Sequence, residues 1–185
     1  MNRKAVKVAV IGAVLLFVVA FFASPLLAVR GLIDAAERGD EAKLERLVDF
    51  PAFRQSLKEE LNARLVAEMR ADLGGRASGL SGLGLLLAPA LIGGAVDAFV
   101  TPPAVAAMVR TAEVPNARDV VRDRAPTAPE EAKGKVRRGY RYSDMNTFVV
   151  RLTRDDEPGE YLDLQLQRRG LFSWKLAGLD LSDPA

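Results

Sequence analysis

Carboxylates are the side chains of this chain best suited to acid–base chemistry, since the sequence contains no histidine and no cysteine. Asp97 has the most apolar setting of the acidic residues, and Asp144 and Asn146 stand where a first strand is expected to begin. A carboxylate buried in apolar surroundings has a raised pKa and can act as a general base. Asp97 can also cap a helix or face solvent, and we favour this plainer interpretation.

The other polar residues form no pattern typical of an active site. The sequence has no paired carboxylates, nucleophile–base pair, glycine-rich phosphate loop or metal-ligand spacing. We therefore expect no cofactor and no metal, and a non-catalytic role is favoured. A small enzyme that uses Asp97 or Asp144 in an apolar cavity is the alternative. The lack of cysteine also excludes disulfides and a lipoprotein attachment site.

The element that must position all later residues is an uncharged run at residues 8–29, which follows Arg3, Lys4 and Lys7. As a helix, this run extends roughly 33 Å, enough to cross the hydrocarbon core of a bilayer. Basic residues concentrate before the run, which favours a cytoplasmic N-terminus. The sequence thus predicts a single-pass anchor over residues 1–29 in the bacterial inner membrane, with the following domain in the periplasm.

A cleaved signal peptide is the alternative to this signal-anchor. The two candidate cleavage sites would place Phe21 or Leu26 at the third residue before the cut, where a small residue is needed. An uncleaved anchor is therefore favoured. Within the run, Ser24 and Pro25 predict an N-cap and a first-turn proline. The helix that they mark either begins there or continues the anchor.

The charge balance argues against nucleic-acid binding. The chain has 26 Lys and Arg residues against 24 Asp and Glu residues, a net charge of +2. Three of the basic residues precede the apolar run, so the rest of the chain has a net charge of −1. A domain so balanced has no electrostatic attraction to a phosphate backbone. Basic residues near Tyr140 and Tyr142 are compatible with nucleotide stacking or anionic lipid headgroups, but a solvated strand edge is favoured.

Residues 30–112 form the predicted helical part of the domain. Within it, apolar residues recur at steps of four on one face of an amphipathic helix. These residues are Phe53, Leu57, Leu61, Leu65, Met69 and Leu73. A second uncharged run, residues 83–96, contains Pro89 and Gly93-Gly94. We favour a buried helix or lid for it, and a second membrane segment, which would return the C-terminal half to the cytoplasm, stays open.

Residues 113–136 have the composition of a linker or surface loop, and residues 137–182 that of a β-meander. Three strands alternate apolar and polar residues, which predicts an antiparallel sheet with one apolar face. The candidate apolar face or pocket consists of Phe148, Val150, Leu152, Leu162, Leu164, Leu166, Trp174 and Leu176. Helices followed by strands give an α+β fold, with the long helix lying across this face.

Two resemblances refine this expectation. Helices split at Gly39-Asp40 and a late meander ending in Trp174-Lys175-Leu176 resemble the nuclear transport factor 2-like superfamily, which implies a curved sheet around an apolar pocket. Its enzymes often place an Asp with a His in that pocket, and this chain has no His. The chain is also similar to the bacterial domain of unknown function 2939 family, which implies no activity. That similarity rests on Ser24-Pro25, Val48-Asp49-Phe50-Pro51, Arg54, Leu57, Leu87-Ala88-Pro89, Val100-Thr101-Pro102, Phe148-Val149-Val150, Arg168-Arg169-Gly170-Leu171 and Trp174-Lys175-Leu176.

The sequence therefore predicts a membrane-anchored extracytoplasmic domain of non-catalytic type. Its expected role is to bind an apolar ligand, a lipid or an envelope protein, and its expected contacts include the membrane itself through residues 1–29. A structural envelope component that acts through its outer surface is a further alternative.

Overall fold

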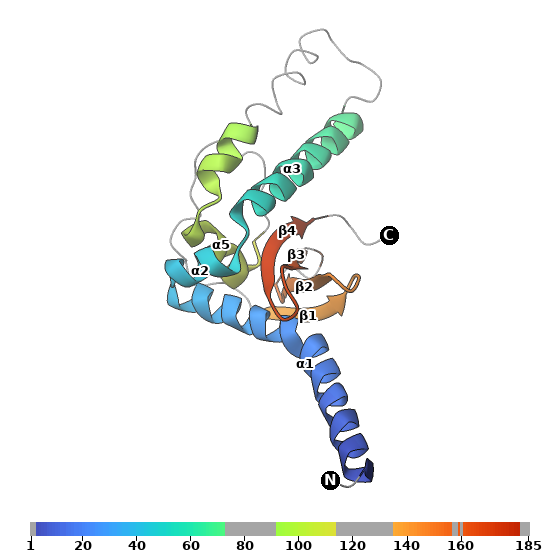
Figure 1. The fold of residues 1–185 in the computed structure, drawn as a ribbon. Coiled ribbons are helices and arrows are strands. Elements are labelled where there is room, and N and C mark those ends of the chain that lie inside the picture. Colours follow the sequence, from blue (N-terminus) through green and yellow to red (C-terminus); the bar gives the residue numbers. More distant parts are fainter. Residues whose placement is uncertain (1–2, 73–91, 114–134, 157–158, 160, 182–185) are drawn as a thin grey trace.

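The chain begins with one long helix and ends with a four-stranded sheet (Figure 1). The computed structural model describes residues 3–72, 92–113, 135–156, 159 and 161–181. The helices are α1 (Arg3–Arg38), α2 (Glu41–Leu47), α3 (Phe50–Asp72), a short helix Ile92–Phe99 and α5 (Pro102–Thr111). The strands are β1 (Val136–Tyr142), β2 (Thr147–Arg154), β3 (Tyr161–Arg168) and β4 (Trp174–Asp180). This α+β architecture confirms the predicted fold class.

Helix α1 has two halves with different surroundings. Large apolar side chains in residues 8–22 are mostly exposed, and Leu16 is 73% exposed. From Ser24 onward one side of the helix is buried, including Val29 and Leu32. We call residues 8–23 the free half of α1 and residues 24–38 its packed half. Figure 1 shows the free half pointing away from the rest of the chain, with a change of direction along α1. The helix contains Pro25.

The bend in α1 follows from Pro25. Proline has no backbone N–H, so it cannot donate to the carbonyl of Phe21 one turn earlier. The Ser24 hydroxyl takes over that role and donates to the Phe21 carbonyl at 2.8 Å. Of the two alternatives for Ser24 and Pro25, the structure confirms that the helix continues the preceding run, since Ser24 lies within a continuous helix and does not cap a new one.

Short segments with polar capping residues connect α1, α2 and α3. Gly39, with a φ of 64°, ends α1, and Asp40 caps α2 by accepting from the Lys43 N–H at 2.9 Å. Asp49 caps α3 in the same way, since its carboxylate accepts from the Ala52 N–H at 3.3 Å. These caps satisfy backbone donors that a helix start leaves free.

Helix α3 shows the predicted amphipathic pattern. Phe53, Leu57 and Leu61 are buried, while Ala63 lies on the exposed side. The side chains at positions 69 and 73 lie outside the described residues.

The second apolar run is described from residue 92 onward, and residues 83–91 lie outside the described residues. Helix Ile92–Phe99 and α5 meet at an angle of 87° and are together apolar enough for a broken span. Val96 and Val100 nevertheless have no exposed surface and belong to the core. The described part of this run is therefore buried within the domain.

The sheet is an antiparallel meander in the order β1-β2-β3-β4. Its first strand was not among the three predicted, because β1 carries arginines and a glycine in place of alternating apolar residues. Tyr140 and Tyr142 pair with Val150 and Phe148, so they extend the apolar face to this edge. Phe172 lies in the β3–β4 turn, and β4 begins at Trp174.

The opposite edge of the sheet, β4, is covered by α3. The Ser56 hydroxyl donates to the Leu179 carbonyl and accepts from the Leu179 N–H, both at 3.1 Å. Glu60 accepts from the Leu181 N–H, and Arg64 donates to the Leu181 carbonyl. Side chains of a helix thus occupy backbone groups that an edge strand usually leaves open to a further strand.

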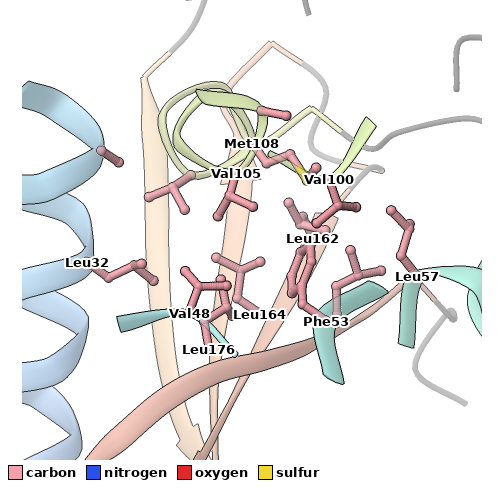
Figure 2. Close-up of a cluster of buried hydrophobic side chains, with 14 of the residues drawn as sticks. Leu32, Val48, Phe53, Leu57, Val100, Val105, Met108, Leu162, Leu164 and Leu176 are labelled. Atoms are coloured by element: carbon pink, nitrogen blue, oxygen red, sulfur yellow. The ribbon is translucent and has the colours of Figure 1, made fainter. Parts of the chain in front are cut away.

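The core lies between this sheet and the helices. Figure 2 shows Leu32 of α1, Phe53 and Leu57 of α3, and Val105 and Met108 of α5 gathered around sheet residues. The sheet residues labelled there are Leu162, Leu164 and Leu176. The packed half of α1 is therefore part of the domain, and only the free half extends beyond it.

Candidate functional site

The eight residues of the predicted apolar face lie together on the sheet and are all at most 3% exposed. Paired residues of β2 and β3, such as Val150 and Leu164, share this face. Leu164 and Leu176 contact side chains of the helices (Figure 2). A ligand on this face would require the helices to separate from the sheet.

The carboxylates singled out in the sequence lie in polar surroundings. Asp97 forms an ion pair with Lys58 at 2.8 Å, and its side chain is 56% exposed. Asp144 accepts from the backbone N–H of Asn146 at 2.6 Å within the β1–β2 turn. This bond and others to Thr147 hold the pKa of the Asp144 carboxyl below its ordinary value. The shift in the pKa of Asp144 is thus opposite to that of a buried general base, and Asp97 is exposed and paired instead of buried in an apolar site.

The buried acid of the described chain is Asp163, which the sequence pattern presented as a polar position on β3. Its side chain is 3% exposed and accepts from Arg151 twice at 2.7 Å and from Arg141 at 3.1 Å. Burial alone would raise the pKa of Asp163, but the hydrogen bonds from Arg151 and Arg141 lower it below the ordinary value. Asp163 is therefore an ionised structural centre on the face opposite the core.

The polar residues with the most specific geometry lie where α1 meets the β3–β4 end of the sheet, which we call the anchor junction. The Trp174 Nε1–H donates to the Ser24 hydroxyl at 2.8 Å, and both residues are almost fully buried. Ser24 in turn donates to the carbonyl of Phe21. The indole thus contacts α1 at the residue that precedes the bend.

Arg168 fills the centre of the anchor junction. Its guanidinium lies 3.9 Å from the ring centre of Phe21 and 4.2 Å from that of Trp174. It also donates to the carbonyls of Met145 at 3.1 Å and Leu171 at 2.6 Å. A cation between two aromatic faces is attracted to both rings. Arg168 therefore holds α1, the β1–β2 turn and the β3–β4 turn together.

Aromatic rings extend this junction along α1. The rings of Phe172 and Phe17 meet edge to face with centres 5.6 Å apart. On the other side, the Tyr142 hydroxyl donates to the Phe22 carbonyl at 2.8 Å, and the two rings also meet. Sheet residues thus contact both the bend and the free half of α1.

The sequence singled out most residues of this site but did not predict that they contact one another. Three separate motifs supply these residues: Ser24-Pro25, Arg168-Arg169-Gly170 and Trp174-Lys175-Leu176. Ser24 and Trp174 are 150 residues apart in the sequence, so no local pattern relates them. A buried serine beside a proline inside an apolar run is the one local signal that pointed to the junction. Among the described residues, no group of three or more acidic residues could hold a metal ion.

Comparison with known proteins identifies the family. Residues 14–108 match the model of the family described as protein of unknown function (DUF2939), and the chain belongs to this family. The matched segment extends from the free half of α1 into α5 and ends before the sheet. No curated protein and no solved structure matches the chain. The likeness to the nuclear transport factor 2-like superfamily stays a prediction.

Proposed function

We propose that this member of the DUF2939 family is a membrane-anchored extracytoplasmic module without catalytic activity, which binds lipid or an envelope protein at the membrane surface. The contrast between the two halves of α1 carries this proposal. An exposed stretch as apolar as residues 8–23 is unfavourable in water and favourable in a bilayer. The packed half, by contrast, buries one side in the domain core, with Val29 and Leu32, and exposes Leu26 and Leu27 next to the free half.

The distribution of charge gives the orientation. Arg3, Lys4 and Lys7 precede the free half, while the packed half mixes both signs, with Asp34 paired to Arg38 and Lys43. Positive residues are retained on the cytoplasmic side. The N-terminus is then cytoplasmic, and the domain lies in the periplasm of a bacterium with α1 in the inner membrane.

The described ionisable groups support a binding role over catalysis. Asp97 is exposed and paired with Lys58, and Asp163 is occupied by two arginines. Each is already satisfied by protein groups, so neither of these two acids is a poised base. The apolar face is likewise filled by helix side chains, so lipid or protein contacts at the surface are better supported than a ligand inside the core.

Reporter fusions after residues 30, 112 and 185 of the chain test this topology. We expect reporters that are active only outside the cytoplasm to work at 112 and 185. A reporter that works only in the cytoplasm should be silent at both positions. If the fusion at 185 were active in the cytoplasm and the fusion at 30 outside it, the chain would cross the membrane a second time and the single-pass topology would be wrong.

A further inference from the structure

We propose that two turns of the domain enter the periplasmic leaflet beside α1 and form a second membrane contact. The contact consists of Met145 in the β1–β2 turn and Leu171 and Phe172 in the β3–β4 turn, which we call the turn patch. This inference rests on the proposed function, since it requires that α1 crosses the bilayer. It adds a lipid-binding site within the domain itself.

The turn patch is apolar, exposed and continuous. Met145 is 61% exposed, Leu171 64% and Phe172 48%. The carbonyls of Met145 and Leu171 both accept from the Arg168 guanidinium, which places the two turns side by side. An exposed apolar group of this kind, held in place by the hydrogen bonds of Arg168, is typical of a contact surface.

The position of the patch along α1 selects lipid as its occupant. The ring of Phe172 contacts that of Phe17, which belongs to the free half. Phe17 lies about 10 Å along the helix axis from Ser24. Phe172 contacts the free half at the level of Phe17, so it has the same surroundings as that part of the helix. When α1 is in the bilayer, Phe172 is therefore beside lipid.

The length of the free half gives an independent reason. Residues 8–23 extend about 24 Å as a helix, which is less than the roughly 30 Å of a hydrocarbon core. Leu26 and Leu27 are exposed and can supply part of the difference, but Ser24 and Val29 on the other side of the helix are buried in the domain. A deeper insertion of α1 therefore carries the domain toward the bilayer. A short span is accommodated when its flanking structure moves toward the bilayer. That movement brings the turn patch into the leaflet.

The surroundings of the patch suit the boundary between lipid and water. Tyr140 and Tyr142, which are 51% and 37% exposed, lie on the neighbouring edge strand, and tyrosine is enriched at such boundaries. The charged groups nearby already have protein partners. Arg169 pairs with Asp49 at 2.7 Å, and Asp144 accepts from backbone within its own turn.

Single-cysteine labelling of the full chain tests the inference, and the cysteine-free sequence needs no prior substitution. Phe172→Cys would carry an environment-sensitive fluorophore in vesicles of phosphatidylcholine and phosphatidylglycerol. Val14→Cys in the free half is the reference for lipid, and Ala63→Cys on the exposed side of α3 is the reference for water. We expect nitroxide-bearing lipids to quench the labels at 172 and 14, and to leave the label at 63 unquenched.

The other possible results distinguish a failure of the turn contact from a failure of the proposed anchor. A quenched label at 14 with a water-like, unquenched label at 172 would overturn the turn contact and leave the anchor in place. A shielded but unquenched label at 172 would assign the patch to a protein partner and also overturn it. An unquenched label at 14 would overturn the proposed anchor itself. Leu171→Cys is a second probe of the same patch if the label at 172 prevents folding, and the same expectation applies to it.

Discussion

At the scale of single residues, Ser24 is a buried polar group with two hydrogen-bond partners. It lies at a proline bend, and its hydroxyl both donates to Phe21 and accepts from the Trp174 indole. A buried hydroxyl that loses a partner leaves polar atoms unsatisfied, which costs more than an exposed bond does. The residue therefore links the path of α1 to the last strand of the sheet.

A double-mutant cycle on Ser24 and Trp174 measures this link. We expect Trp174→Phe, which removes the indole N–H, to lower the free energy of unfolding, with about 0.5–1.5 kcal/mol attributable to the lost hydrogen bond. Ser24→Ala should cost more, because it also leaves the Phe21 carbonyl without its donor. The double variant should be less destabilised than the sum of the two. Strict additivity in denaturant unfolding of the detergent-solubilised chain would refute the bond.

The pH dependence of stability tests the centre at Asp163. The pKa of this carboxyl is lower in the folded protein than its ordinary value of 3.8, owing to Arg151 and Arg141. Its contribution to stability is therefore present above about pH 4 and is lost as the pH falls through the folded pKa. We expect Asp163→Asn to cost about 1.5–3 kcal/mol at neutral pH and to flatten the acid limb of the stability curve.

Asp97→Asn is the matched control for Asp163→Asn, because Asp97 is an exposed acid in an ion pair. Its effect should stay within about 0.5 kcal/mol at neutral pH. An acid limb that is unchanged in Asp163→Asn would show that other carboxylates whose pKa values are lowered in the folded protein, such as Asp34 and Asp144, dominate there.

At the scale of elements, the close approach of α3 to the edge of β4 decides which residues fit at the contact. A Cβ atom added at Gly178 would lie 2.8 Å from the Ser56 hydroxyl oxygen and 3.2 Å from its Cβ. That hydroxyl also serves both backbone groups of Leu179. The glycine thus allows the helix to reach the strand backbone.

Gly178→Ala tests this contact. We expect a loss of about 1–3 kcal/mol in the free energy of unfolding, because the methyl group forces α3 away from the strand. Gly170→Ala is the control, since its added Cβ would meet only Ser173 at an ordinary 3.5 Å. Equal thermal stability of the two variants would contradict the close contact.

The spacing of apolar residues predicted the helices and strands that bury one face. It did not predict features that depend on contacts between residues distant in the sequence. The steps of four in α3 and the alternation in β2 and β3 located these elements correctly. Strand β1 was expected only as a solvated strand edge, because Arg137, Arg138 and Gly139 precede its two tyrosines and no alternating apolar pattern marks it. The role of Arg168 was not predicted either, because it depends on Phe21 and Trp174, which come together only in the fold.

At the scale of the whole molecule, α1 joins an exposed apolar helical half to a folded domain. The composition of residues 8–29 suggested that the whole run belongs to the anchor. The structure divides the run at Ser24, because the side chains beyond it are needed to complete the core with α5 and the sheet. Hydropathy cannot distinguish burial in lipid from burial in protein, so this division was visible only in the fold.

The central claim is that the domain lies outside the cytoplasm at the end of a single membrane span. The most direct test is the reaction of single cysteines in the full chain with a membrane-impermeant maleimide, applied to cells with a permeabilised outer membrane. We predict that Ala63→Cys, on the exposed side of α3, is labelled in intact cells. Asn2→Cys should react only after the inner membrane is opened. Labelling of Asn2→Cys in intact cells, with protection of Ala63→Cys, would contradict the claim.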